Sequence, residues 1–206
     1  MPVAKKIIVD DGIVGLFKMT ETIGELESKY FSYFREVPAI SGFQHDRRKK
    51  EWLSIRILIA ELIGRNFNIE YSDDGSPQLS HPEFHYISIS HSAMYAAVYL
   101  HKNKKAGLDV ESLSRNFVSI EKKYLSPEEL EQAMENELLH AIYWCCKEAV
   151  FKWAGREGVD FRKQIKIGKF NPDETNVIYA VFHNQDEQQV KLSFDIVEGN
   201  VLVYTI

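Results

Sequence analysis

The strongest constraint on the fold is a pair of long helical patterns, each set among short segments that alternate like strands. The first pattern covers residues 46–64, with Asp46 as a possible N-cap and Gly64 as a plausible stop. The second covers residues 138–154. Each half of the chain therefore offers short strands around one long helix, which predicts an α+β fold with a boundary near residues 101–104.

Shorter signals account for much of the remaining chain. Residues 3–19 alternate loosely around an Asp-Asp-Gly turn signal, which predicts a hairpin, and a helix is expected from about Thr20. Ser126, Pro127 and Glu129 have the spacing of an N-cap, N1 and N3, so another helix is expected to begin there. Strands are expected at residues 85–90, 96–100, 105–111, 177–182, 190–197 and 201–205.

Composition narrows the class of protein. The 206 residues, 45% of them hydrophobic, suffice for one large domain or two small ones. The net charge of −5 disfavours a general binder of nucleic acid or of anionic membranes. Cys145 and Cys146 are neighbours in a helical pattern, so we expect neither a disulfide between them nor a zinc site. The first residues lack the apolar run of a signal peptide, and a reduced, cytoplasmic protein is expected.

Two carboxylates leave the same face of a predicted strand. Asp109 and Glu111 stand two residues apart, and like charges on one face repel unless a cation or much water lies between them. An ordinary surface strand would explain the pair, and so would a bound cation. Gly107, just before them, would let another backbone or a ligand approach closely.

A stripe of Trp144, Glu148 and Lys152 recurs every four residues along the second helical pattern. One interpretation is a surface ion pair between Glu148 and Lys152, worth about 0.2–0.5 kcal/mol. The other is a half-buried wall whose acid holds a metal and whose base holds a phosphate. Oxygen ligands from Asp and Glu favour Mg²⁺, which shares its remaining positions with water and phosphate oxygens.

Two further segments could bind an anion. The basic run at residues 47–50 opposes the helix dipole, so it is either solvated or an anion site. Ser88 and Ser90 form the polar face of a strand that ends at His91. A histidine there is often structural, but hydroxyls and an imidazole at a turn also suit a phosphate oxygen.

Taken in order, these segments resemble the signature motifs of the 4′-phosphopantetheinyl transferases. The chain length and the strand-rich ends resemble the two-lobed, surfactin-synthetase-activating (Sfp-type) branch of that family. The matching segments are a basic helix start with Arg48, Glu51, Leu53 and Arg56, then Ile89-Ser90-His91-Ser92, Ala106-Gly107-Leu108-Asp109-Val110-Glu111, Leu125-Ser126-Pro127-Glu128-Glu129 and Trp144-Cys145-Cys146-Lys147-Glu148-Ala149-Val150-Phe151-Lys152.

The resemblance implies two similar lobes, residues 1–102 and 103–206, each a small, mainly antiparallel sheet packed on a long helix and related by a pseudo-two-fold axis. It implies a holo-[carrier protein] synthase, which moves 4′-phosphopantetheine from coenzyme A to a serine of an apo acyl or peptidyl carrier protein and releases adenosine 3′,5′-bisphosphate. The first lobe would bind the nucleotide side of coenzyme A, and the second would carry the acids. No nucleic acid or membrane partner is expected, and a monomer could form the site.

The resemblance also implies a role for each matching residue. Asp109, Glu111 and Glu148 would hold Mg²⁺ on the pyrophosphate, and Glu148 would be the base for the carrier serine. Lys152 would contact the pyrophosphate. Contacts to the phosphates of coenzyme A would come from Ser90, His91, Arg48 and Arg56.

One position departs from the family pattern, and it bears on the alternatives. Ser76, between Gly75 and Pro77, stands where the family often has a lysine that helps bind the nucleotide. The same acids could instead serve another Mg²⁺-dependent phosphoryl-transfer or phosphodiester-cleaving enzyme. The loss of the lysine leans toward a catalytically silent module that binds coenzyme A or the carrier. A docking surface for an acidic carrier would have to be local, for example Lys102, Lys104, Lys105, Lys122 and Lys123.

Overall fold

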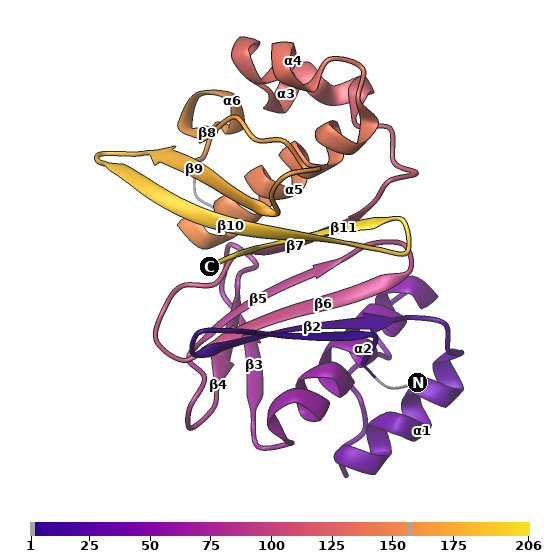
Figure 1. Cartoon of the computed structure of the whole chain (residues 1–206). Coiled ribbons are helices and arrows are strands. Elements are labelled where there is room, and N and C mark those ends of the chain that lie inside the picture. Colours follow the sequence, from indigo (N-terminus) through magenta and orange to yellow (C-terminus); the bar gives the residue numbers. More distant parts are fainter. Residues whose placement is uncertain (1–2, 156–157) are drawn as a thin grey trace.

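Two antiparallel sheets, each packed against one long helix, build most of the molecule (Figure 1). The computed structural model describes residues 3–155 and 158–206. The N-terminal half contains β1 (Lys5–Val9), β2 (Gly12–Lys18), α1 (Ile23–Tyr33), α2 (Asp46–Ile63), β3 (Asn68–Tyr71), β4 (Pro77–Ser80), β5 (Tyr86–His91) and β6 (Tyr95–His101). The C-terminal half contains β7 (Leu108–Ser112), the 3₁₀ turn η1 (Val118–Ile120), α3 (Glu121–Tyr124), α4 (Pro127–Ala133), α5 (Glu137–Ala154), α6 (Phe161–Gln164), β8 (Ile165–Ile167), β9 (Val177–His183), β10 (Glu187–Val197) and β11 (Asn200–Thr205).

The strand order brings two edge strands together. The first sheet has the order β1-β2-β6-β5, and the second has the order β7-β11-β10-β9-β8. Strands β5 and β7 are therefore each the edge of their own sheet, and they lie side by side where the two halves meet (Figure 1). Strands β3 and β4 form a separate hairpin beside β5.

Three groups of buried apolar side chains hold these elements. One lies between α2 and the first sheet and includes Leu58 and Val98. A second lies between α5 and the second sheet and includes Cys146 and Leu192. The third group, which includes Leu108, lies between the two sheets. The junction of the halves therefore has a buried apolar group of its own, and it can hold polar groups in position.

Gly107 sets the distance between β7 and α5. A Cβ atom at this position would lie 2.2 Å from the carbonyl oxygen of Ala149 and 2.8 Å from Cβ of Trp153. The close approach of another backbone that the sequence suggested at Gly107 is confirmed, and the approaching backbone is that of α5. Only a residue without a side chain lets the helix settle against the strand in this way.

Capping boxes mark the starts of α1 and α4, but not of α2. Ser126 and Glu129 form the expected capping box, with Pro127 in the first turn of α4. The helix start expected near Thr20 is wrong, because Thr22 forms a capping box with Glu25 and α1 begins at Ile23. The expected cap at Asp46 is also wrong: the residue before it, His45, is the N-cap of α2, and its side chain makes no capping hydrogen bond.

The expected mixture of helices and antiparallel sheets is confirmed, as are the hairpin of β1 and β2 and the strands of the C-terminal tail. The hairpin of β3 and β4 was not expected from the sequence. The pseudo-two-fold relation of two lobes and their bounds at 1–102 and 103–206 stay predictions. Within the described residues, 3–155 and 158–206, no helix combines the length and the apolar character needed to cross a bilayer.

Candidate active site

Serine side chains of β5 join the two edge strands. The backbone N–H of Leu108 donates to Ser88 Oγ at 3.1 Å, and the N–H of Val110 donates to Ser90 Oγ at 3.3 Å. Beyond the strand end, Ser92 Oγ donates to the side chain of Asn200 at 2.9 Å. The hydroxyls therefore occupy the place that carbonyls of a paired strand would take, and the polar face of β5 lies directly against the acids of β7.

Asp109 is the centre of this junction. The residue is only 4% exposed, and its Oδ1 accepts hydrogen bonds from Ser90 Oγ at 2.6 Å and from Lys152 Nζ at 2.8 Å. Lys152 Nζ also donates to the carbonyl of Leu108 at 2.9 Å. The second oxygen, Oδ2, is buried and has no hydrogen-bond partner among the described residues. A buried carboxylate oxygen without a donor is costly unless a ligand completes it, so this atom marks a candidate binding position.

Glu111 lies near Asp109 at the rim of the junction. Burial and the neighbouring Asp109 carboxylate raise its pKa, while the ion pair with Arg115 opposes that shift. The Arg115 guanidinium lies over the rings of Phe117 and Trp144, 5.1 Å and 4.7 Å from their centres. Arg115 was missed in the sequence, although its position four residues after Glu111 was a usable signal.

The stripe on α5 faces this region as a half-buried wall. Trp144, Glu148 and Lys152 are all partly exposed, whereas their neighbours Cys145, Cys146, Ala149 and Val150 are buried. Within residues 3–155 and 158–206, no group of three or more His, Cys, Asp or Glu side chains is arranged to hold a metal ion. Lys152 is more than one member of a surface pair, because its ammonium contacts Asp109 on another element.

A cavity of about 560 Å³ opens in the N-terminal half between α2, β3 and the end of β5. Arg48 and Arg56 from α2 line it, together with His91. Glu51, which is buried, accepts hydrogen bonds from Arg47 at 2.8 Å and from Arg48 at 3.2 Å. The basic start of α2 is therefore not merely solvated, because part of it is held by a buried acid at a cavity wall.

Two of the basic side chains that line this cavity are partly buried, which affects their pKa values. The Arg56 guanidinium stacks 3.6 Å from the ring centre of Trp52, and burial lowers its pKa. Burial also lowers the pKa of His91, and the nearby Arg47 and Arg48 act in the same direction, while Glu51 opposes them. His91 Nδ1 lies 3.3 Å from Glu51 Oε1 without hydrogen-bond geometry. Its imidazole can therefore turn toward a ligand in the cavity.

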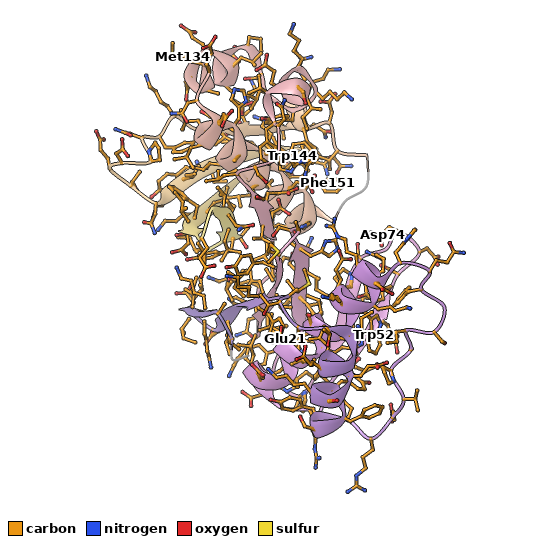
Figure 2. The ribbon with its side chains drawn as sticks, turned by 90° about the vertical axis from the view of Figure 1, so that its right-hand side faces the viewer. Glu21, Trp52, Asp74, Met134, Trp144 and Phe151 are labelled. Atoms are coloured by element: carbon orange, nitrogen blue, oxygen red, sulfur yellow. The ribbon has the colours of Figure 1, made fainter. Side chains whose placement is uncertain are left out.

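A second cavity, of about 460 Å³, lies beside the first. It is lined by residues of both halves, among them Ser88, Lys105, Lys152 and Trp153. Pro77 lines both cavities, so the two are neighbours. In Figure 2, Trp52 and Asp74 lie in the N-terminal half and Trp144 in the C-terminal half. The first cavity thus has the cations of α2 in its wall, and its neighbour has Lys152.

A comparison with protein families bears on the chemistry of the C-terminal half. Residues 105–203 match the 4′-phosphopantetheinyl transferase superfamily. The match implies a transferase of that type, and it contains Asp109, Glu111, Glu148 and Lys152. No curated protein matches the chain. The residues of the N-terminal half lie outside the matched segment, so their grouping around the first cavity comes from the structure alone.

The structure brings most of the expected site residues of the superfamily into one region. Asp109 and Lys152 are in contact at the junction, and Ser90 touches the Asp109 carboxylate. The remaining positions lie around them as follows: Glu111 at the rim, Glu148 on the wall of α5, and Arg48, Arg56 and His91 around the neighbouring cavity. Glu51 was noticed only as part of a motif, and its role as the acid that holds two arginines comes from the structure.

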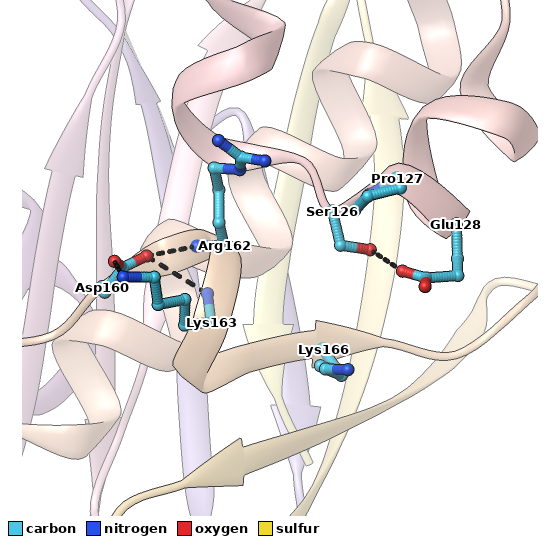
Figure 3. A pocket seen from close by; sticks show the side chains of 7 residues that line it. All are labelled: Ser126, Pro127, Glu128, Asp160, Arg162, Lys163 and Lys166. Atoms are coloured by element: carbon cyan, nitrogen blue, oxygen red, sulfur yellow. Dashed lines mark hydrogen bonds and ion pairs between the residues drawn. The ribbon is translucent and has the colours of Figure 1, made fainter.

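The five lysines expected to form a docking surface do not lie together. Lys102 and Lys104, near the end of β6, pair with Glu83 and Asp10. Lys122 belongs to α3, which lies at the far end of the C-terminal half (Figure 1). Another cavity, of about 560 Å³, opens near α3, between the start of α4 and the α6–β8 segment (Figure 3). It is lined by Ser126, Pro127, Glu128, Asp160, Arg162, Lys163 and Lys166.

Proposed function

We propose that the protein transfers 4′-phosphopantetheine from coenzyme A to the serine of an apo acyl or peptidyl carrier protein and releases adenosine 3′,5′-bisphosphate. The observation that carries this proposal is the buried Asp109 carboxylate, which meets Ser90 and Lys152 where the two halves join. The superfamily match of residues 105–203 names the same reaction type.

Coenzyme A suits the two neighbouring cavities by its charge and its aromatic base. Its nucleotide carries phosphates and an aromatic base, and the first cavity offers Arg48 and the Arg56–Trp52 stack. Its pyrophosphate would then reach the junction, where Lys152 provides an ammonium. Cations aimed at a transferring phosphoryl group supply most of the catalysis in such reactions. Because one chain provides both cavities and the acids, we infer a monomer of the two-lobed branch.

The acids at the junction fit Mg²⁺ by donor type. Magnesium takes oxygen ligands and keeps several waters, so one or two carboxylates are enough to place it. Asp109 offers Oδ2, which has no hydrogen-bond partner among the described residues, and Glu111 lies close enough for the Asp109 charge to raise its pKa. Glu148, one helical turn before Lys152 on α5, is the proposed third carboxylate, although the three acids do not form a ready-made metal group in the described residues. When bound, the metal neutralises the charge that develops on the pyrophosphate oxygens.

Three residues of the chain have further proposed roles in the transfer. Glu148 takes the proton of the carrier serine, because a free hydroxyl is a poor nucleophile and a nearby carboxylate can accept its proton. Lys152 stabilises the charge on the leaving phosphate. Ser90 holds Asp109 in place through the 2.6 Å hydrogen bond, which differs from the phosphate contact expected for it from the sequence.

In the decisive experiment, the protein is incubated with coenzyme A, Mg²⁺ and several apo carriers, and the mass of each carrier is measured by mass spectrometry. A gain of one phosphopantetheine supports the proposal. Hydrolysis of coenzyme A without a carrier would point to another phosphodiester-cleaving enzyme, and binding without any turnover would point to a silent module. Either result would overturn the proposal.

The role of Glu148 can be tested in the same assay. Glu148→Gln keeps the size of the side chain but removes its charge and basicity, so single-turnover transfer should fall by about 10²–10⁴-fold. Glu137→Gln, an exposed change at the start of the same helix, should leave the rate within about twofold. A wild-type rate for Glu148→Gln at saturating Mg²⁺ would refute its role as the base.

A further inference from the structure

Each carboxylate of β7 is paired with a cation of the chain itself. Lys152 Nζ lies 2.8 Å from Asp109 Oδ1, and the guanidinium of Arg115 pairs with Glu111. The two acids that would hold a metal are thus already neutralised in the structure. Two carboxylates held close together require such a compensation, because their mutual repulsion and their burial both disfavour the charged forms.

The two cations differ in how firmly they are held. The Arg115 side chain is 41% exposed and sits at the rim, so it can leave Glu111 for water at little cost. The Lys152 side chain is only 11% exposed, and its ammonium is also bound to the Leu108 carbonyl. A cation that binds Asp109 therefore has to displace Lys152 or bind beside it.

A divalent metal and Lys152 cannot share Asp109 without strain. Oδ1 of Asp109 already accepts two hydrogen bonds, from Ser90 and from Lys152, and only Oδ2 is left for a ligand. A dication on Oδ2 would face the ammonium across a single carboxylate group, in a buried setting where water screens poorly. Repulsion between such charges weakens metal binding, because the effective dielectric constant of a buried site is well below that of water.

We propose that Lys152 is the internal counter-cation of Asp109 in the metal-free protein and that it competes with the metal for this carboxylate. The inference rests on the proposed function and deepens it. When the metal binds, the ammonium leaves Oδ1, and the pyrophosphate of coenzyme A becomes its new partner. The same lysine thus stabilises the empty site and then binds the substrate.

A coupling between metal and coenzyme A follows from this competition. Without coenzyme A, the displaced ammonium has no anion to pair with, so the metal binds weakly. With coenzyme A present, the pyrophosphate accepts the ammonium and the metal binds more tightly. Linkage requires the reverse as well, so the metal should tighten coenzyme A binding by the same factor.

The test measures Mn²⁺ binding by electron paramagnetic resonance, with neither coenzyme A nor a carrier present. Lys152→Met removes the competing ammonium while keeping an unbranched side chain, so Mn²⁺ should bind at least about tenfold more tightly than to the wild type. The matched control is Lys105→Met, which removes the same charge from an exposed residue lining the same cavity. Its Mn²⁺ affinity should change by less than about threefold, because an exposed charge is screened.

The outcomes separate this inference from the proposed function. Equal or weaker Mn²⁺ binding to Lys152→Met would overturn the competition. So would the absence of binding to both proteins at about 10 mM Mn²⁺, a concentration far above the dissociation constant of a typical metal site. A similar gain in Lys105→Met would reduce the effect to general charge and would overturn it too. Failure of the wild type to load any carrier would instead reject the proposed function, and the Mn²⁺ titration does not depend on that result.

Discussion

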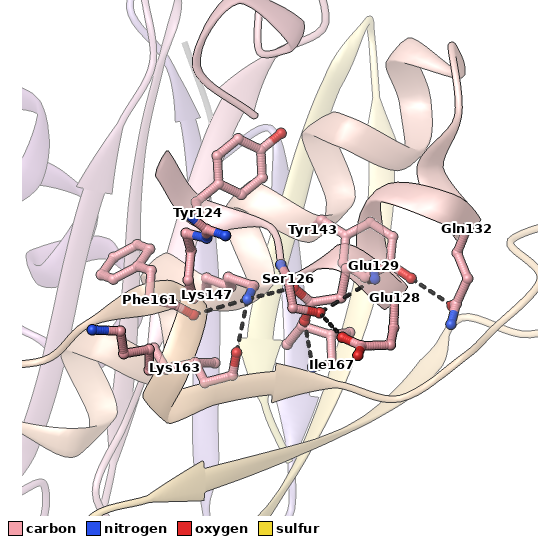
Figure 4. A network of polar contacts seen from close by, with 12 residues as sticks. Tyr124, Ser126, Glu128, Glu129, Gln132, Tyr143, Lys147, Phe161, Lys163 and Ile167 are labelled. Carbon is pink, nitrogen blue, oxygen red and sulfur yellow. Dashed lines mark hydrogen bonds and ion pairs between the residues drawn. The ribbon is translucent and has the colours of Figure 1, made fainter. Parts of the chain in front are cut away.

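The buried ion pair between Lys147 and Glu129 gives the sharpest prediction about stability (Figure 4). Lys147 is fully buried, and its ammonium lies 2.7 Å from Glu129 Oε2, 2.9 Å from the Phe161 carbonyl and 2.7 Å from the Ile165 carbonyl. Glu129 also accepts the backbone N–H of Ile167 at 2.8 Å. The pair therefore ties α4, α5 and the α6–β8 segment together just before Glu148.

Removing one partner should cost far more than a surface ion pair does. Lys147→Met leaves the Glu129 carboxylate buried without a cation and two carbonyls without a donor, which should lower the free energy of unfolding by about 3–5 kcal/mol. Glu129→Gln keeps an oxygen for one backbone N–H, so we expect a smaller loss of about 2–4 kcal/mol. Because both changes break one interaction, the double variant should lose less than the sum of the two.

Urea denaturation followed by circular dichroism measures these losses. The matched control is Lys163→Met, an exposed lysine nearby whose partner Asp160 lies 3.6 Å away, and it should change the free energy of unfolding by less than about 0.5 kcal/mol. If Lys147→Met fails to fold, Glu129→Gln provides the comparison. A loss below about 1 kcal/mol in Lys147→Met, or additive losses in the double variant, would refute this reasoning.

Two further predictions concern the cavity and the fold. Burial lowers the pKa of His91 below its usual value near 6.5, so its imidazole should be neutral at pH 7.5 and gain charge only at lower pH. Coenzyme A binding, measured by calorimetry, should strengthen as the pH falls from about 7.5 to 5.5. Over the same range the folded protein should lose the stability that the neutral imidazole contributes, because folding lowers the pKa of His91. In His91→Ala the affinity should depend less on pH. An unchanged profile in that variant would show that His91 does not contact the ligand. Gly107→Ala would place a Cβ 2.2 Å from the Ala149 carbonyl, so its thermal unfolding should show a loss of about 2–3 kcal/mol, and a wild-type midpoint would contradict the close approach.

Local signals predicted the elements well where a side chain completes a cap or a turn. The capping box of Ser126 and Glu129 was visible because both partners lie within four residues. The same rule would have selected Thr22 over Thr20, since only Thr22 is followed by a glutamate three residues later. The hairpin of β3 and β4 escaped because its strands are four residues each, too short for a clear alternation.

The members of the candidate site could be proposed from the sequence, but their contacts could not. Asp109 and Glu111 were expected on one face of a strand, and that strand is β7. The contact of Asp109 with Lys152 joins residues 43 positions apart, and the packing of α5 on β7 creates it. The hydrogen bond from Ser90 depends on two sheet edges meeting, which no local pattern contains.

The meeting of β5 and β7 through serine hydroxyls has a consequence for how such a site can be varied. In a continuous sheet, the backbone repeat holds neighbouring strands about 4.8 Å apart whatever the side chains are. Here Ser88 and Ser90 bridge the gap, so its width depends on the length and polarity of two side chains. A change of one hydroxyl-bearing residue at this seam can alter the spacing between the neighbouring cavity and the acids while each sheet keeps its own backbone ladder.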